Sequence, residues 1–169
     1  MCFCEEKTIM KTNSPQKMSG LSMRSMFRCM MEDGYYPTFE QTHIQLGLDD
    51  NIAVLEYEEG VLSVRLFFSI DEDAYELFLE ASNSTMLKTF AVKPVILDDM
   101  HNIMFSCEML CSNLREFRKL LPWAIERLQE ALTIHKAEMK RLVLASEVAA
   151  KTIPATDDFV TGSSRKLLS

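Results

Sequence analysis

Apolar residues between positions 19 and 34 recur at the spacing of an amphipathic helix. Ser19 or Ser22 can cap its first free N–H groups, because a hydroxyl oxygen accepts hydrogen bonds from them. Gly34 tolerates the left-handed conformation in which helices commonly end, and Pro37 prevents the helix from resuming. We therefore predict a helix whose apolar stripe consists of Met23, Met26, Phe27, Met30 and Met31.

Strand-like apolar patterns bounded by turn sequences then predict three consecutive strands. They cover residues 44–48, 52–57 and 61–70, with apolar side chains at every second position, as on one face of a sheet. Asp49-Asp50-Asn51 and Glu58-Glu59-Gly60 are turn sequences that separate them. Because turns this short join antiparallel neighbours, the three strands are expected to form a meander.

A second helix and two further strands are predicted after residue 70. Asp71-Glu72-Asp73 places carboxylates where the helix dipole favours negative charge. The strand predicted at 90–97 contains Pro94, which lacks an amide donor and favours an edge position or a bulge. The turn at 98–102 then leads into a last strand at 103–110. The buried stripe of this helix is predicted to consist of Ala74, Leu77, Phe78 and Ala81.

A long helix is predicted to follow, because Asn113 and Glu116 have capping-box spacing. Pro122 lies inside it and predicts a kink or a break into two helices. The order α-β-β-β-α-β-β-α indicates an α+β fold, an antiparallel five-stranded sheet with helices packed on it. The apolar stripe of the long helix consists of Leu114, Phe117, Leu121, Ala124, Leu128, Leu132, His135, Met139 and Leu142.

The same pattern predicts three regions along the chain. Residues 1–18 lack an apolar period and are expected to form a flexible N-terminal arm. Residues 19–146 are predicted to form a single α+β domain, and residues 147–169 a C-terminal tail. A chain of 169 residues can bury about 70% of its surface, enough for one sizeable core.

Composition excludes several classes of protein. Lys and Arg number 18 against 25 Asp and Glu, and the resulting net charge of −7 argues against a nucleic-acid partner. No stretch of 18 apolar residues occurs, so we expect no membrane association. The five cysteines are an odd number without a secretory signal, which favours a reducing compartment and a cytoplasmic protein.

Neither a catalytic nor a phosphate-binding motif occurs in the sequence, so we expect no enzyme and no cofactor. The alternative is an enzyme whose site is assembled from scattered residues. Isolated carboxylates near turns are usually solvated, and a general base needs partners that position it. The residues of that alternative site are Glu56, Glu58, Arg65 and His101.

Cys107 and Cys111, with His101 nearby, are the best metal candidates in the sequence. Zinc takes four nitrogen or sulfur ligands, usually from two clustered pairs, and no second pair lies near in sequence. We therefore expect no bound metal and two thiols that act as small buried apolar groups.

Two groups of apolar residues are candidates for partner binding. The chain has 12 methionines, and a flexible thioether face suits adaptable binding surfaces. The apolar band at residues 128–142 exceeds what a five-stranded sheet is expected to cover, so a second copy of the chain is the predicted partner there. In both cases the alternative is burial within the chain. The candidates are Met23, Met30 and Met31, expected to stay accessible, and Leu128, Leu132, His135 and Met139.

Four segments between about residue 19 and residue 143 carry a family resemblance, together with the element order. They are Asp33-Gly34-Tyr35-Tyr36-Pro37, Val61-Leu62-Ser63-Val64-Arg65-Leu66, Phe90-Ala91-Val92-Lys93-Pro94-Val95-Ile96-Leu97-Asp98-Asp99 and Asn113-Leu114-Arg115-Glu116-Phe117. This part of the chain resembles the YbjN family of bacterial sensory transduction regulators, which shares its fold with type III secretion chaperones. The resemblance implies a small acidic dimer that binds another polypeptide and catalyses nothing.

The sequence thus predicts a non-enzymatic protein-binding module, chaperone-like or regulatory. We expect it to bind a protein or peptide client through an apolar helix face and a sheet edge. Two alternatives stay open, the enzyme with a scattered site and a purely structural subunit of a homodimer. The latter differs by lacking an open apolar groove.

Overall fold

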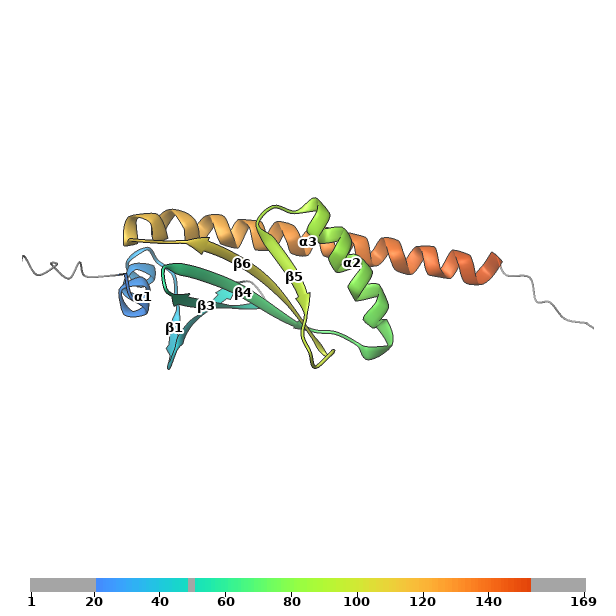
Figure 1. Cartoon of the computed structure of the whole chain (residues 1–169), viewed down its shortest axis with the longest axis horizontal. Helices are drawn as coiled ribbons and strands as arrows, with labels where there is room; N and C mark the ends of the chain where they lie inside the picture. Colours follow the sequence, from blue (N-terminus) through green and yellow to red (C-terminus); the bar gives the residue numbers. More distant parts are fainter. Residues whose placement is uncertain (1–20, 49–50, 153–169) are drawn as a thin grey trace, which may run out of the picture. The chain divides into compact units, whose positions relative to one another are not determined.

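The computed structural model describes residues 21–48 and 51–152, so the predicted N-terminal arm lies outside the described residues. Six strands, three α-helices and one short 3₁₀ helix follow one another along them (Figure 1). They are α1 (Met23–Glu32), β1 (Thr38–Glu40), β2 (His43–Leu48), β3 (Asn51–Glu58), β4 (Val61–Ser69), the short 3₁₀ helix η1 (Glu72–Ala74), α2 (Tyr75–Lys88), β5 (Val92–Ile96), β6 (Asn102–Leu110) and α3 (Leu114–Thr152).

The six strands form one sheet in the order β1-β2-β3-β4-β6-β5. The pairs β1–β2, β2–β3 and β5–β6 are antiparallel, which confirms the predicted α+β class. β5 is an edge strand, as Pro94 predicted, because the missing amide hydrogen interrupts no ladder on its outer side.

The predicted number of five strands is wrong, because β1 adds a sixth. All three of its residues are exposed, and they carry no apolar alternation that a sequence pattern can detect. Pairing with β2 defines it instead, with Phe39 opposite Ile44 and Glu40 opposite His43. The ring of Phe39 also meets the ring of Phe27 on α1 edge-on, with 5.7 Å between ring centroids.

The chain forms two compact units. In the described residues, unit 1 comprises residues 21–48, 51–65 and Glu108–Ala124. Unit 2 comprises Leu66–Cys107 and residues 125–152. The strands β4 and β6 and the helix α3 each contribute residues to both units.

The core of unit 1 lies between α1, the strands β2 to β4 and the first turns of α3. Ser22 caps α1 in a reciprocal capping box with Ser25, and Gly34, with φ of +85°, follows the helix as predicted. On the surface, Arg118 of α3 pairs with Glu32 and Asp33. The fully buried side chains include Met26, Met30, Ile44, Leu55, Leu62, Val64, Phe117 and Leu121.

The core of unit 2 lies between the remaining parts of β4, β6 and α3, together with α2 and β5. α2 packs against β5 (Figure 1). Of the stripe predicted for α2, Ala81 is fully buried, whereas Ala74, Leu77 and Phe78 are half-buried. The buried apolar residues of unit 2 include Leu66, Val92, Ile103, Phe105, Leu128, Ala131 and Leu142.

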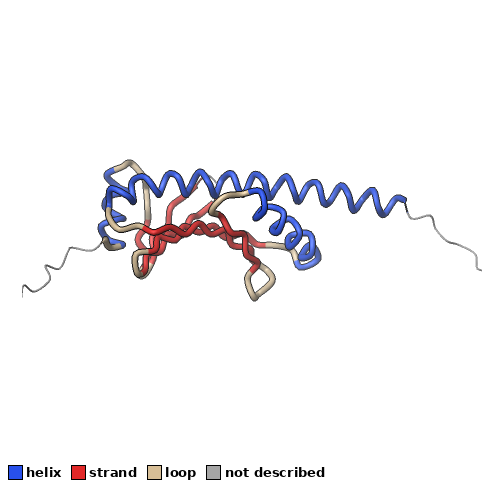
Figure 2. The backbone as a smooth tube through the Cα atoms, turned by 45° about the horizontal axis from the view of Figure 1, so that its top comes forward, coloured by secondary structure: helices blue, strands red, loops and turns tan. Residues whose placement is uncertain are grey.

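α3 begins at the predicted capping sequence and runs without a break for 39 residues (Figure 2). The Asn113 side chain accepts from the Glu116 amide at 2.9 Å, and the Glu116 carboxylate accepts from the Ser112 amide at 2.8 Å. Of the two outcomes predicted at Pro122, a kink or a break, the break is wrong, because buried Phe117, Leu121 and Ala124 hold one continuous helix on both sides of the proline. The residues 147–152, predicted as tail, belong to this helix.

Within the described ranges, no helix is both long enough and apolar enough to cross a membrane.

Candidate functional site

Unit 2 contains an apolar hollow with a volume of about 320 Å³. Four residues from β4, α2 and β6 line it, namely Phe68, Phe78, Ile103 and Phe105. One face of α3 supplies the rest at the spacing of successive helix turns. These helix residues are Leu132, His135, Lys136 and Met139.

His135 lies against the aromatic wall of the hollow and is only 5% exposed. Its ring meets Phe105 edge-on at 5.2 Å and Phe78 at 5.8 Å between centroids. The ring nitrogen Nε2 lies 3.4 Å from the Ser82 hydroxyl, which itself donates to the Phe78 carbonyl. Burial lowers the pKa of His135 below its ordinary 6.5, and a hydrogen bond with the Phe78 backbone partly offsets this shift. The imidazole is therefore neutral at neutral pH.

Glu138, one helix position outside the hollow, anchors α3 to α2. Its carboxylate accepts from Lys88, Ser84 and Arg141, the last two at 2.9 and 3.0 Å. These charge-assisted hydrogen bonds lower the pKa of Glu138 to about 2. Glu138 is thus ionised at every pH at which His135 titrates, and it fixes α2 beside the hollow.

The stability of the protein is expected to fall as the pH drops below about 6.5. The unfolded chain then protonates His135, whereas the folded chain, with its lowered pKa, resists protonation. The stabilising contribution of the neutral ring is complete above about 6.5 and is lost as the pH falls through the folded pKa. Thermal unfolding at pH 7.5 and 5.5 measures this loss.

Two variants separate His135 from other titrating groups. His135→Phe keeps an aromatic ring among Phe78 and Phe105 and should reduce the difference between the two melting temperatures. Lys140→Gln, which removes an exposed charge on α3 outside the hollow, should leave that difference unchanged. An undiminished difference in His135→Phe would contradict the assignment.

The structure places the predicted partner-binding residues in both units. Leu132, His135 and Met139 come together in the hollow of unit 2. In unit 1, Met31 is 52% exposed and Met23 is half-buried. These positions remain predictions as a binding surface.

Two of the candidate partner-binding residues are buried within the chain. Met30 is 0% exposed because it faces the strands of unit 1, so the expectation that it stays accessible is wrong. Leu128 and its neighbour Ala131 are also 0% exposed, because unit 2 itself covers this part of α3. The expectation that the whole band from residue 128 to residue 142 lacks cover is therefore wrong.

The sequence analysis missed the four hollow residues outside α3. Two signals were available, because the alternation of β4 placed Phe68 on the same face as Leu66 and the stripe predicted for α2 included Phe78. β6 reaches this site because it is the neighbour of β4 in the sheet, although 32 residues separate the two strands in sequence. The spacing of strands along the sequence does not predict that β4 and β6 are neighbours.

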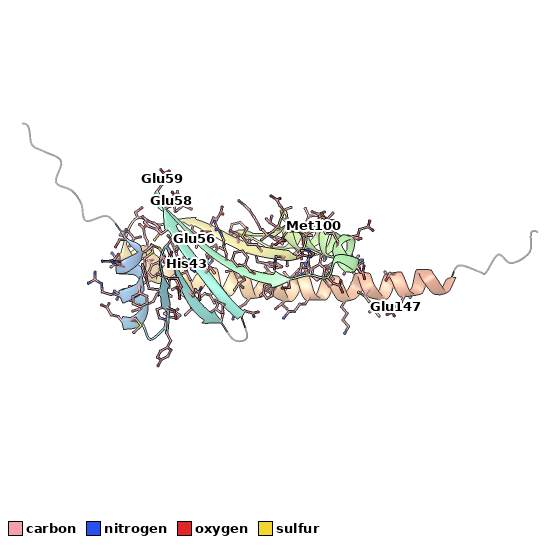
Figure 3. All side chains as sticks on the ribbon, turned by 90° about the horizontal axis from the view of Figure 1, so that it is seen from below. His43, Glu56, Glu58, Glu59, Met100 and Glu147 are labelled. Atoms are coloured by element: carbon pink, nitrogen blue, oxygen red, sulfur yellow. The ribbon has the colours of Figure 1, made fainter. Side chains whose placement is uncertain are left out.

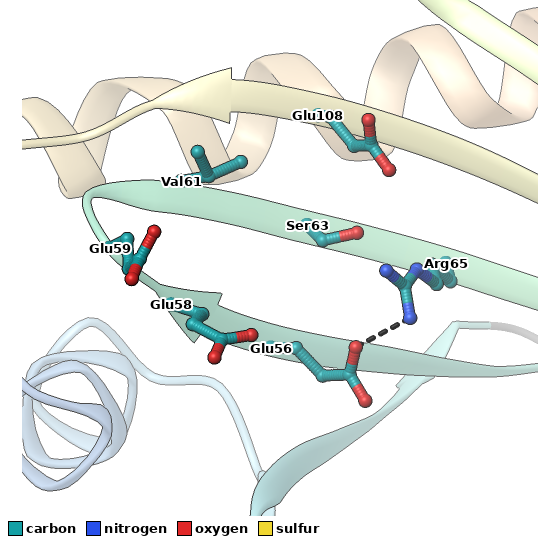
Figure 4. Close-up of a pocket in the computed structure, with 7 residues that line it drawn as sticks. All are labelled: Glu56, Glu58, Glu59, Val61, Ser63, Arg65 and Glu108. Atoms are coloured by element: carbon teal, nitrogen blue, oxygen red, sulfur yellow. Dashed lines mark hydrogen bonds and ion pairs between the residues drawn. The ribbon is translucent and has the colours of Figure 1, made fainter.

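A second pocket, of about 320 Å³, lies on the sheet of unit 1 and is polar (Figure 4). It brings together Glu56, Glu58 and Arg65, three residues of the alternative enzyme site, whereas His101 belongs to unit 2. Arg65 pairs with Glu56 across the strands β3 and β4. Figure 3 shows Glu56, Glu58 and Glu59 along the end of β3 and its turn. Glu59, Val61, Ser63 and Glu108 complete the lining, and the sequence analysis did not single them out.

Cys29, Cys107 and Cys111 are buried thiols outside any disulfide in the part of the chain that the structure describes. Burial raises the pKa of Cys29 and of Cys111. In the described ranges, no three His, Cys, Asp or Glu side chains are placed to hold a metal ion. The absence of bound zinc stays a prediction, which elemental analysis of the purified chain tests.

Comparisons with known proteins support the fold. No family model matches the sequence, and no curated protein matches it. Among solved structures, the fold is similar to that of YbjN from E. coli, described as "a putative transcription regulator". The TM-score is 0.60 at 10% sequence identity, and the match covers 72% of this chain and 94% of YbjN. A likeness at this identity shows a shared fold.

Proposed function

We propose that this chain is a non-enzymatic protein-binding module, chaperone-like or regulatory, whose apolar hollow receives an apolar side chain of a polypeptide partner. The observation that carries this proposal is the hollow itself, about 320 Å³ in volume and lined mainly by phenylalanine and aliphatic side chains. Its size is at the lower end of ligand pockets in general and fits a side chain of leucine or phenylalanine.

The lining favours a peptide over a polar metabolite. Only His135 and Lys136 bring polar atoms to the hollow, and His135 is neutral and already placed beside Ser82. Sites for polar small molecules hold them with several convergent polar groups, which this hollow lacks. A partner that inserts an apolar anchor gains most of its binding energy by desolvation.

The edge of the sheet in unit 2 gives the partner a second contact. β5 is the edge strand, and its Val95 is 41% exposed. An extended peptide can add to such an edge through backbone hydrogen bonds. Pro94 contributes no donor, so binding at the edge depends on the other residues of β5.

A photo-crosslinking residue on the rim of the hollow tests the proposal. We expect p-benzoylphenylalanine at Lys136 to form a protein adduct in native cytoplasm, because Lys136 is exposed and lines the hollow. The same residue at Lys140, exposed on α3 outside the hollow, serves as the control. Adding Leu132→Asp to the Lys136 chain should remove the adduct, whereas adding Leu144→Asp on the exposed side of α3 should not.

Equal adducts at both crosslinking positions, or an adduct that survives Leu132→Asp, would contradict the proposed site. Circular dichroism of Leu132→Asp establishes that the sheet and helices remain.

A second copy of the chain is the simplest partner, and we propose that it also uses the hollow. Sedimentation at micromolar concentration separates a 19.4 kDa monomer from a dimer that Leu132→Asp dissociates.

A further inference from the structure

We propose that the polar pocket of unit 1 binds the guanidinium group of an arginine side chain from a polypeptide partner. This site shares no residue with the apolar hollow, and either proposal can fail without the other. Strand alternation builds it, because Glu56 and Glu58 lie on one face of β3 while Ser63 and Arg65 lie on one face of β4.

The charge of the pocket selects a cation. Four carboxylates and one guanidinium line it (Figure 4). Arg65 is paired with Glu56, which neutralises both charges. Within the described residues, Glu58 and Glu59 have no cationic partner, and both are exposed at the mouth of the pocket. A cationic ligand can therefore pair with them without displacing an existing ion pair.

Ser63 is an independent sign of a ligand. Its side chain is 6% exposed, and its hydroxyl has no hydrogen-bond partner within the described part of the chain. Figure 4 shows this hydroxyl on the pocket side of β4, between Glu108 and the glutamates of β3. Buried hydroxyl groups are nearly always hydrogen-bonded, so the pocket holds an unused polar group where a ligand would lie.

Arg65 provides a second unused donor. Its Nε–H is buried and lacks an acceptor among the described residues, although its terminal nitrogen binds Glu56. A carbonyl oxygen of a peptide backbone is the acceptor that both this Nε–H and the Ser63 hydroxyl can serve. The pocket thus combines acidic groups for a cation with donors for a nearby carbonyl, the two features that an arginine residue within a peptide presents together.

Arginine fits better than a metal ion or a lysine. No three ligating side chains in the described residues are arranged around a metal position. Glu58 and Glu59 both line the pocket, and a planar guanidinium can bridge two carboxylates through its fork of N–H donors. The ammonium group of lysine lacks that geometry.

The backbone of Glu59 allows a test in which stability and binding are expected to change in opposite directions. Its φ is +49°, and it precedes Gly60 at +88° in the tight turn between β3 and β4. Glycine and asparagine are the usual residues at such positions, because a side chain there is strained. We expect Glu59→Gly to raise the melting temperature and yet weaken arginine binding.

Titration of the full chain with a blocked peptide tests the proposal by NMR. The probe is acetyl-Gly-Arg-Gly-amide, and the control is the peptide with uncharged citrulline in place of arginine. We expect saturable shifts of the backbone amides of residues 58–65 and of the Arg65 Nε–H, with citrulline at least about tenfold weaker. The lysine peptide should bind with intermediate affinity.

Three variants decide the residues involved. The double change Glu58→Gln and Glu59→Gln should weaken the arginine peptide by about tenfold or more, because it removes two charge-assisted hydrogen bonds. Ser63→Ala should also weaken binding while leaving the melting temperature unchanged or higher. Glu147→Gln, which removes an exposed charge on α3 in unit 2, should leave the affinity unchanged.

The proposal is overturned if residues 58–65 show no saturable shift, or if citrulline binds as well as arginine. An unchanged affinity in the double glutamine variant would overturn it as well. None of these outcomes bears on the crosslink at Lys136, which reports on the hollow of unit 2 alone.

Discussion

Leu128→Ala is expected to lower the free energy of unfolding by about 2–5 kcal/mol, the range for emptying a buried leucine site. Leu128 is 0% exposed in unit 2 and lies on α3 next to Ala131, which is equally buried. The loss combines the transfer free energy of the removed methyl groups with a cavity that the surrounding side chains fill only in part. Urea unfolding followed by circular dichroism measures it.

Leu144→Ala is the matched control, because it makes the same chemical change on the same helix at a side chain that is 53% exposed. We expect an effect within about 0.5 kcal/mol. Repeating both measurements at two protein concentrations also tests whether one chain or a second copy covers Leu128. If a second copy covered it, the loss of unfolding free energy in Leu128→Ala would change with protein concentration. A cost that is small, or that depends on concentration, would contradict burial within one chain.

Pro122→Ala is expected to act in the opposite direction and raise the free energy of unfolding by about 2 kcal/mol. A proline inside a helix costs about 3 kcal/mol relative to alanine, because it removes one hydrogen bond and crowds the preceding turn. Its rigid ring recovers up to about 1 kcal/mol by restricting the unfolded chain. Pro122 is exposed, so its replacement leaves no cavity.

Lys119→Ala, at an exposed position one turn earlier in α3, is the control and should change stability by no more than about 0.5 kcal/mol. The two alanine variants isolate the proline effect, since both place the same residue on the same helix surface. If Pro122→Ala brings no stabilisation, the chain does not maintain helical hydrogen bonding across this position, and the sequence-based prediction of a division there was correct.

Local signals predicted most of the fold. The spacing of Met26 and Met30 and the turn at Gly34 placed α1, with Ser22 one of two predicted caps, and the strand patterns placed β2 to β4 within one or two residues. Pro94 indicated an edge position or a bulge for β5, and the edge position is the one found. Each of these features depends on residues close together in the chain, where side-chain direction repeats with a known period.

The errors share one physical cause. β1 exists only because β2 offers a partner, and its three exposed residues have no periodicity of their own. Pro122 lowers helix propensity, but the buried residues around it outweigh that preference. Met30 lies on the predicted stripe, and its burial depends on how much of that stripe the strands of unit 1 cover. In each case tertiary packing decided the outcome, and the local pattern did not contain it.

The candidate sites were accessible to sequence reasoning only in part. The spacing of Leu132, His135 and Met139 placed them on one face of α3, and the hollow includes all three. Phe105 reaches the hollow because β6 is the neighbour of β4, and Glu58, Ser63 and Glu108 share a pocket for the same reason. A repeat of 3.6 or two residues specifies which side of an element is buried. Strand neighbours, and the spaces that packing leaves unfilled, depend on contacts between distant residues, and these appear only in the folded chain.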